Sequence, residues 1–538
     1  MTRMYDRPTL GPDGWIVDET PTPALLTWSL DASGNPVGLV GPGGQVQPYV
    51  GIADRHRMLN DQPYGITRAV RNPGKLVARF IASEVTINNG SPVLADHTGY
   101  DAAGDITGIV SITGQPNLLK VTPAADTTEG IRFTNFGTSV VNAALAGKFG
   151  MYVYIENLPR YGPGLTPTTT LKAIFTTEAG GSTTNGIDIT FTSNQIHEGW
   201  NFISFIQREP LAYQTGGGAI EYHPYGVSCV KYGSGIDGDI VNNPITKIII
   251  QWNNASGATL YFDSIITGWL TDAQVVLGVD ALESDVIDYV LPVFQQYGWR
   301  GYVAVPARVW TSGSKIVSSL SSSDGYADLT SRAEALNAAG WDMINHTVNH
   351  QSNGVLTSAS EIAYEVKGVQ PIYSAAGLTR GNEFYASPNS STSRLAEKVI
   401  AGCGIKLQRH AIKANVDITP WGVPNINHIG SSGAGSNSGN GYNYVTDGAN
   451  TGVTGLQKNS KLRILTDVMI AYGATWFPFW HYVTTIGDSG SGEDLTGDNL
   501  YMTKSAFELW MAYIREKEVA GELRVCQGVT GFYYGIGK

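Results

Sequence analysis

The stretch WDMINHTVNHQS, Trp341–Ser352, places a short apolar run directly before two histidines, His346 and His350. The segment before it, SRAEALNAA, has a helical pattern that we expect Thr330 to cap and Gly340 to end. WDMIN is then expected to be a buried strand with His346 at its carboxyl end. A helix that leads through a glycine into a buried strand is typical of a parallel β/α fold, in which functional residues gather at strand carboxyl ends.

The same alternation of strand and helix continues on both sides of this stretch. AQVVLGVD, Ala273–Asp280, has the pattern of a buried strand, and GYVAVP, Gly301–Pro306, that of the next one. Apolar residues spaced i, i+3, i+4 and i+7 predict a helix between them, and they are Ile287, Val290, Leu291 and Phe294. The later units are SRLAEKVIAGCG, KLRILTDVMIAYG, ATWFPFWHYV and KSAFELWMAYIREKEVAGELRVCQ. This alternation over residues 272–538 predicts a parallel (β/α) barrel.

The first half of the chain has a different pattern. Over residues 73–271, β-branched and aromatic runs such as FGMYVYIE, Phe149–Glu156, alternate with turn residues, which predicts a two-sheet sandwich of jelly-roll type. Residues 1–72 are rich in Gly, Pro and Asp and are expected to form small hairpins or an extended arm. A chain of 538 residues is too long for one core, in agreement with three such segments.

Composition restricts the partners that we expect. The net charge is −11, from 35 basic and 46 acidic residues, and no dense basic run is present, so neither nucleic acid nor a membrane surface is an expected partner. The three cysteines are far apart and suggest no disulfide framework. No standard signal peptide and no apolar stretch long enough to span a membrane are recognisable.

Three ionisable side chains follow three of the predicted strands, namely Asp280, His346 and His481. Neutral imidazole is a good ligand for Zn²⁺, and histidines four residues apart can meet one ion where the backbone turns helically. The other interpretation of the pair His346 and His350 is structural, with both rings capping a helix or hydrogen-bonded to the backbone.

Three of these segments resemble motifs of the polysaccharide deacetylases, the NodB-like carbohydrate esterases of family 4 type. AGWDMINHTVNH resembles their motif G-x-E-[IL]-[GA]-N-H-[ST]-x-x-H. VVLGVDALESDVIDYVLPVFQQYGWRGYVAVP resembles their first motif, in which a strand ends in T-F-D-D, and WFPFWHYV resembles their last, an apolar strand ending in His. The resemblance covers about 273–538 and implies a distorted (β/α) barrel of NodB type that removes acetyl groups from sugars with the help of a metal.

Carried over residue by residue, the resemblance assigns a role to each of four side chains. His346 and His350 would hold a divalent metal, for which Zn²⁺ is the first expectation. Asp280 would be the general base, and His481 the general acid. Two weaker matches, EFYASPNSS and ITPWGVPN, imply substrate-binding roles for Tyr385 and Trp421.

The chain departs from the family motifs at two places. The second Asp of the first motif, which is the third metal ligand in the family, is Ala281 here. Either Glu283 or Asp285 reaches the metal instead, or Asp280 becomes a ligand, or the domain has become a binding module. The segment YASP that starts at Tyr385 also lacks the arginine that orients the base in the family.

The N-terminal segment, residues 1–72, adds an expectation about the biological setting. DASGNPVGLVGPGGQVQPYV, Asp31–Val50, resembles the short anchoring segments of phage tail spikes and fibres. This implies a virion protein that works outside the host cell, beside other phage tail proteins and as a homotrimer, as is common for tail fibres. Its partner would be a bacterial surface polysaccharide such as a capsule, O-antigen or exopolysaccharide.

Three functional hypotheses follow from these resemblances. The first is a phage tail enzyme that deacetylates the polysaccharide, with a sandwich that resembles carbohydrate-binding jelly rolls in EGWNFISF, Glu198–Phe205. The second is a catalytically inactive receptor-binding protein that recognises the same glycan. The third is a bacterial enzyme exported without a standard signal.

Overall fold

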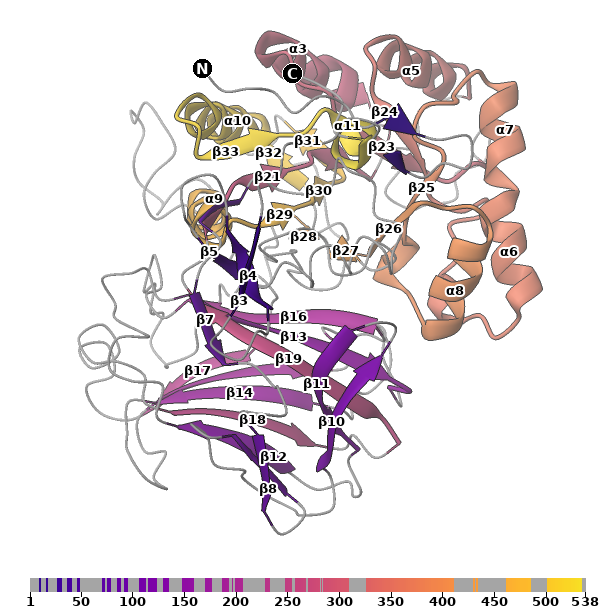
Figure 1. Ribbon diagram of the computed structural model, residues 1–538. Coiled ribbons are helices and arrows are strands. Elements are labelled where there is room, and N and C mark those ends of the chain that lie inside the picture. The colour runs from indigo at the N-terminus through magenta and orange to yellow at the C-terminus, as the bar shows by residue number, and fades with distance from the viewer. Residues whose placement is uncertain are drawn as a thin grey trace.

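The structure is a computed structural model of the 538-residue chain (Figure 1). In the second half it describes residues 270–280, 282, 284–308, 326–410, 429–430, 432–433, 461–484 and 501–534. In the first half it describes strands β1 to β19 and residues 122, 157–158, 196 and 257–258.

An eight-stranded parallel sheet forms the centre of the second half. Its strands, in spatial order, are β27 (Ile429–Gly430), β26 (Leu407–His410), β25 (Phe384–Ala386), β24 (Asp342–Asn345), β23 (Tyr302–Val305), β22 (Gly278–Val279), β30 (Pro478–Trp480) and β28 (Ser432–Gly433). From β22 to β26 neighbours in space are also neighbours in sequence, as successive β/α units require. The parallel β/α prediction is confirmed, and the curled sheet fits a distorted barrel.

The first main strand and the strand that ends at Trp480 are each split between two sheets. A separate parallel sheet contains β29 (Thr475–Trp476), β21 (Ala273–Val275) and β33 (Leu523–Val525). Asp280 N donates to Trp480 O at 2.9 Å, so the two split strands stay in register beyond the break. Gly278 permits this path, because a Cβ there would lie 2.1 Å from the Tyr302 ring.

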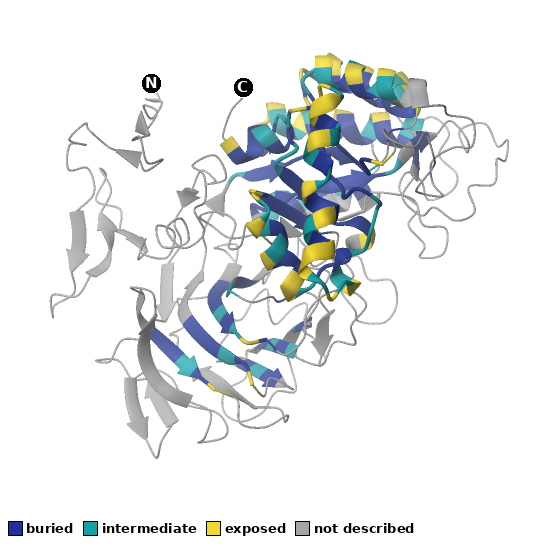
Figure 2. Cartoon of the chain, turned by 90° about the vertical axis from the view of Figure 1, so that its right-hand side faces the viewer, coloured by how far each residue is buried: buried dark blue, intermediate teal, exposed yellow. Residues whose placement is uncertain are grey.

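Helices cover the outer side of the sheet, except for α11 (Gly528–Tyr534), which packs on the opposite face with Tyr302 and Ala304 (Figure 1). They are the π-helical turn η3 (Val286–Val290), α3 (Leu291–Tyr297), α5 (Tyr326–Ala338), α6 (Ala359–Lys367), α7 (Val369–Ala375), α8 (Arg394–Gly402), α9 (Lys461–Tyr472), α10 (Lys504–Val519) and α11. Two short 3₁₀ turns are η4 (Asn353–Val355) and η5 (Pro388–Ser390). Many of these helices are buried on one side and exposed on the other (Figure 2).

Glycines end the first two predicted helices, but the second helix begins earlier than expected. Gly298 and Gly340 have φ of 71° and 81°, the left-handed conformation that glycine adopts at helix ends. The expectation that Thr330 caps the second helix is wrong, because α5 begins at Tyr326 and Thr330 lies inside it. Nothing between Tyr326 and Thr330 breaks a helix, so the helix extends past the residue that looked like a cap.

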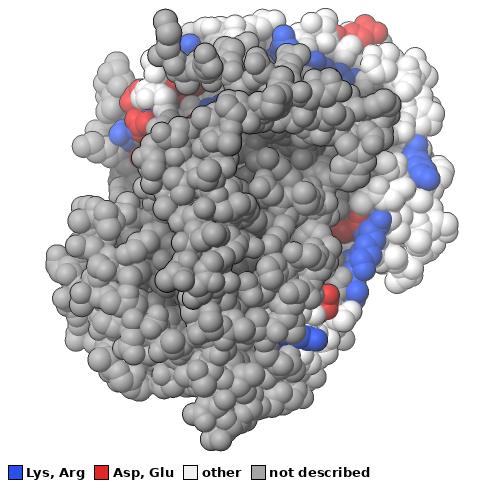
Figure 3. All heavy atoms as spheres, in the orientation of Figure 1, with Lys and Arg blue, Asp and Glu red and all other residues white. Residues whose placement is uncertain are grey.

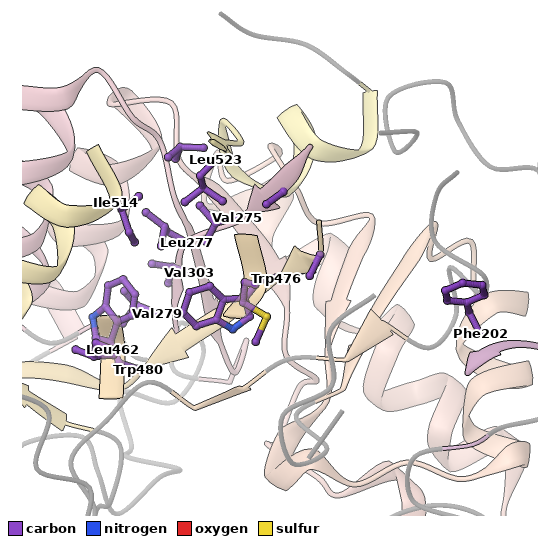
Figure 4. Close-up of a cluster of buried hydrophobic side chains, with 14 of the residues drawn as sticks. Phe202, Val275, Leu277, Val279, Val303, Leu462, Trp476, Trp480, Ile514 and Leu523 are labelled. Carbon is purple, nitrogen blue, oxygen red and sulfur yellow. The ribbon is translucent and has the colours of Figure 1, made fainter. Parts of the chain in front are cut away.

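The core beneath the sheet is rich in tryptophan. Trp476 and Trp510 have ring centroids 5.7 Å apart, and Trp480 and Trp510 have theirs 6.0 Å apart. Val275 and Leu277 belong to the same cluster as Trp476 (Figure 4). Large buried side chains therefore pack against the split first strand directly before Asp280.

The first half contains two larger antiparallel sheets. One consists of β10 (Ile106–Ile112), β11 (Gln115–Val121), β19 (Thr259–Thr267), β13 (Lys148–Glu156) and β16 (Gly199–Ile206), with β7 (Lys75–Ala78) beside β19. The other consists of β12 (Glu129–Thr134), β18 (Lys247–Asn253), β14 (Thr170–Thr176), β15 (Gly186–Thr192) and β17 (Ser228–Tyr232). Trp252 of β18 contacts Phe262 of β19, with ring centroids 5.9 Å apart. The all-β prediction is confirmed for these strands, while the jelly-roll topology and the domain limits stay predictions.

The remaining described strands are short. They are β1 (Thr9–Leu10), β2 (Ile16–Val17), β3 (Thr27–Leu30), β4 (Pro36–Val40), β5 (Val46–Pro48), β6 (Val70–Asn72), β8 (Val85–Asn88), β9 (Ser91–Leu94), β20 (Leu270–Thr271), β31 (Tyr482–Thr484) and β32 (Tyr501–Thr503). Within the described residues, no helix is long and apolar enough to cross a membrane. Where Figure 3 shows described charged side chains, basic and acidic ones are interspersed.

Candidate active site

The predicted catalytic residues lie at one edge of the parallel sheet. Asp280 follows β22, His346 follows β24 and His481 follows β30. All these strands are parallel members of the same sheet, so their carboxyl ends share an edge. Asp280 and His481 are closest in register, because Val279 pairs with Trp480. The sequence prediction that these three side chains gather at one edge agrees with this geometry.

His346 is held as a neutral imidazole. Its side chain is 3% exposed, and its Nδ1 lies 2.9 Å from the carbonyl oxygen of Ala386. Because a carbonyl can only accept, Nδ1 carries the proton and Nε2 keeps its lone pair. Burial lowers the pKa of His346 well below its usual value, and the nearby His350 adds to this effect.

His350 stands beside it in an unusual backbone conformation. The two ring centroids are 4.9 Å apart, and φ is 56° at His350 and 66° at Thr347. Burial lowers the pKa of His350, the charge of Asp280 raises it, and His481 lowers it. Two neutral imidazoles, one with Nδ1 bound to a backbone oxygen, are the form in which histidines bind metals.

Asp280 has two oxygens in different environments. Oδ2 lies 2.5 Å from an Nη atom of Arg409, whose side chain is only 1% exposed. Arg409 also donates to the Tyr302 hydroxyl at 3.3 Å and stacks on the Phe479 ring, with its guanidinium carbon 4.5 Å from the ring centroid. Oδ1 is buried and has no hydrogen-bond partner in the part of the chain that is described. One oxygen is therefore fixed, and the other remains available to accept a proton.

Arg409 was not among the residues predicted from the sequence. The segment YASP that starts at Tyr385 contains no arginine that could orient Asp280. Ala386 of that segment pairs in register with Arg409 on the neighbouring strand β26, so the arginine reaches Asp280 from one strand further along the sheet. A signal was present, because a charged residue inside the buried strand LQRH needs a counter-charge.

Of the two alternative acidic ligands, the structure describes only Asp285. Asp285 is buried, and its Oδ2 accepts a hydrogen bond from Val483 N at 2.6 Å, which anchors the segment after His481. Among the described residues, no three or more His, Cys, Asp or Glu side chains are grouped closely enough to hold a metal. The ligand role of Asp285 therefore stays a prediction, and Glu283 lies outside the described residues.

One of the two expected substrate contacts lies in the described part of the chain. Tyr385 is 0% exposed, and its hydroxyl accepts a hydrogen bond from Asn353 Nδ2 at 3.1 Å. It packs in a core cluster with Ile362 and Ala396, and its substrate-binding role stays a prediction. Trp421 lies outside the described residues.

The residues present fit two of the positions that a metal ion needs. His346 and His350 offer neutral rings side by side, and metal-bound histidines commonly have their second nitrogen bound as His346 has here. The described residues do not complete a set of three protein ligands.

Comparison with known structures gives distant likenesses only. A family 4 carbohydrate esterase from Streptomyces lividans in complex with acetate is 14% identical, covers 47% of this chain and 92% of its own, and has a TM-score of 0.26. A family 4 acetyl xylan esterase from Clostridium thermocellum in complex with a cobalt ion is 11% identical, with coverages of 48% and 90% and a TM-score of 0.26. A CE4 family pseudoenzyme from Bacillus anthracis is 14% identical, and the chain spans 43% of its length, with 26% of this chain covered and a TM-score of 0.21.

Comparison of the sequence with protein families gives a direct match. No curated protein matches the chain. Residues 269–407 match the family model described as polysaccharide deacetylase, a segment that includes Asp280, His346 and His350. Residues 269–407 are thus similar to a polysaccharide deacetylase domain, and this similarity supports a carbohydrate esterase, which is a hydrolase.

Proposed function

We propose that the site at the carboxyl edge of the sheet removes acetyl groups from a polysaccharide with the help of a divalent metal held by His346 and His350. The observation that carries the proposal is that Asp280, His346 and His481 each follow a parallel strand of one sheet, with the His350 ring 4.9 Å from the His346 ring. The charges of Asp280 and His481 both act on His350, and His350 and His481 both act on His346. A base, an acid and two metal-binding rings are the parts that metal-assisted hydrolysis of an acetyl group requires.

The protein's own residues would move the protons. Asp280 uses its unbound Oδ1 to take a proton from a water molecule, while Arg409 holds Oδ2 and fixes the direction of the carboxylate. The water oxygen adds to the acetyl carbonyl carbon. His481 then gives a proton to the leaving nitrogen or oxygen as its bond to that carbon breaks, and acetate is released. A bound divalent ion supplies Lewis acidity for the carbonyl and for the water.

Our finer proposal concerns the metal and the setting. Zn²⁺ is the proposed ion, because imidazole ligands suit it. The proposed substrate is a bacterial surface polysaccharide, and the proposed setting is a phage tail, where the protein acts outside the cell beside other tail proteins and as a homotrimer. The resemblance of Asp31–Val50 to phage anchoring segments supports this setting.

A receptor-binding protein without catalysis is the second candidate. Ala281 in place of the family's third ligand favours it, as does the absence of a three-ligand group from the described residues. Such a protein would bind the same glycan and leave its acetyl groups in place.

Acetate release separates the two candidates. We expect the protein with added Zn²⁺ or Co²⁺ to release acetate from at least one of a set of N-acetylated and O-acetylated polysaccharides. We expect Asp280→Asn to abolish that release while the metal content stays unchanged, because only the base is lost. No release from any substrate, with binding of the polysaccharide retained, would support the receptor-binding protein. Loss of metal in Asp280→Asn would make Asp280 a ligand rather than the base.

A further inference from the structure

The loop that carries the two histidines is held in a strained conformation. Thr347 and His350 have φ of 66° and 56°, and neither is glycine. Residues other than glycine are strained in the left-handed region and persist there only where the surroundings enforce the conformation. This conformation brings the His350 ring to 4.9 Å from His346, so the contacts that enforce it also determine the spacing of the pair.

One residue of helix α6 makes three of those contacts. The side chain of Glu365 is 6% exposed, and its Oε2 accepts a hydrogen bond from Asn349 N at 2.9 Å. Its Oε1 accepts from Asn349 Nδ2 at 2.6 Å. Its backbone oxygen accepts from Val348 N at 2.9 Å. Glu365 therefore binds the two residues that directly precede His350.

The chemistry of these contacts requires a carboxylate. Asn349 presents two donors, its backbone N–H and its Nδ2, and each meets a different oxygen of Glu365. A glutamine has one acceptor oxygen, so its amide nitrogen would face one of the two Asn349 donors. The remaining polar atom of Asn349, Oδ1, already accepts from Arg308 Nη1 at 3.3 Å, so the amide cannot simply turn over.

We propose that Glu365 is a positioning residue for the histidine pair. Through its bonds to Asn349 it holds His350 in place. The inference rests on the proposed function only in that the pair is taken to be the metal site. Glu365 itself touches neither ring, and it acts on the loop between them.

The test compares Glu365→Gln with a matched control, Glu397→Gln. Glu397 lies on α8, is also 6% exposed, and accepts from Thr392 Oγ1 at 3.3 Å, away from the histidine loop. Two quantities are measured on the full chain, namely Co²⁺ affinity by calorimetric titration and amide hydrogen exchange of the peptide that covers residues 346–352. In Glu365→Gln we expect Co²⁺ affinity to fall about 10–100-fold and exchange of this peptide to rise, while other peptides keep their rates. Glu397→Gln should leave both quantities unchanged.

A compensating variant excludes general damage to the fold. In Glu365→Gln with Asn349→Asp, the glutamine nitrogen meets an aspartate oxygen and the backbone N–H of residue 349 keeps its acceptor, so donors and acceptors match again. Asn349→Asp alone sets two carboxylates against each other. We therefore expect the double variant to regain slow exchange and Co²⁺ affinity that neither single variant has.

The outcomes separate this inference from the proposed function. If the amides of residues 346–352 exchange at the same rate in Glu365→Gln as in the unaltered protein, Glu365 does not position this loop, whatever the Co²⁺ affinity. If the unaltered protein binds no Co²⁺ but Glu365→Gln still loosens this peptide and the double variant restores it, Glu365 positions the loop and the metal part of the proposed function fails.

Discussion

At the scale of single residues, the buried pair of Asp280 and Arg409 is the feature on which the chemistry depends most. Their side chains are 6% and 1% exposed, so each charge relies on the other rather than on water. The pair fixes one carboxylate oxygen and leaves the other unbound. A base arranged in this way is oriented before any substrate arrives.

Replacing Arg409 by Met should therefore damage both stability and turnover. The buried Asp280 charge is then uncompensated, and the expected loss is about 3–5 kcal/mol in the free energy of unfolding. Turnover should fall by about 100-fold or more, because the base loses its orientation. Adding Asp280→Asn to Arg409→Met should recover much of the stability and none of the activity. Equal instability of the single and double variants in denaturant melts would contradict the ion-pair argument.

At the scale of elements, the split first strand decides where Asp280 lies. Strand β21 pairs with β29 and β33, whereas β22 pairs with β23 and β30. The chain therefore passes from one sheet to the other between Val275 and Gly278, just before Asp280. Gly278 is the first residue after this passage, and its Cα lies against the Tyr302 ring. The Tyr302 hydroxyl in turn accepts a hydrogen bond from Arg409.

We expect Gly278→Ala to be destabilising by about 1–3 kcal/mol, because its Cβ would lie 2.1 Å from a fully buried ring. Activity should fall with it, since Tyr302 and Arg409 must move together. Gly402→Ala is the control, because nothing lies within 4 Å of its Cβ position at the end of α8. That variant should be neutral or slightly stabilising in thermal melts. Equal melting temperatures for the two alanine variants would show that the strand tolerates the methyl group.

Many of the helices and strands could be predicted from the sequence, and the features that could not be predicted depend on tertiary contacts. Short buried strands and glycines at helix ends are local signals, so the β/α alternation and His346 at a strand end were predictable. The places of Arg409 and Glu365 depend on contacts between segments far apart in sequence, which local patterns do not record. The burial of Tyr385 could not be predicted for a similar reason, because it comes from helices that pack over β25.

At the scale of the whole molecule, Asp342 ties the start of β24 to the C-terminal helix α11. It is 0% exposed, accepts from Thr530 N and Oγ1 at 2.7 Å each, and pairs with Arg380 at 2.8 Å. Burial raises the pKa of Asp342, although Thr530 and Arg380 oppose the shift.

This raised pKa predicts a pH dependence with a definite sign. A folded-state pKa above the unfolded value adds stability below the unfolded pKa of about 3.9, and that contribution is lost as the pH rises through the folded pKa. The stability of the unaltered protein relative to Asp342→Asn should therefore decrease from acidic to neutral pH. Melting temperatures of the two proteins across this range give the difference. An increase instead would mean that the bonds from Arg380 and Thr530 outweigh burial.

The central claim is that His346 and His350 bind a metal, and elemental analysis of the purified protein tests it most directly. After incubation with Zn²⁺ or Co²⁺ and removal of free ion, we expect about one metal ion per chain, and none in His350→Ala, because one remaining imidazole is a weak site. No metal in the unaltered protein, or the same amount in His350→Ala, would contradict the claim.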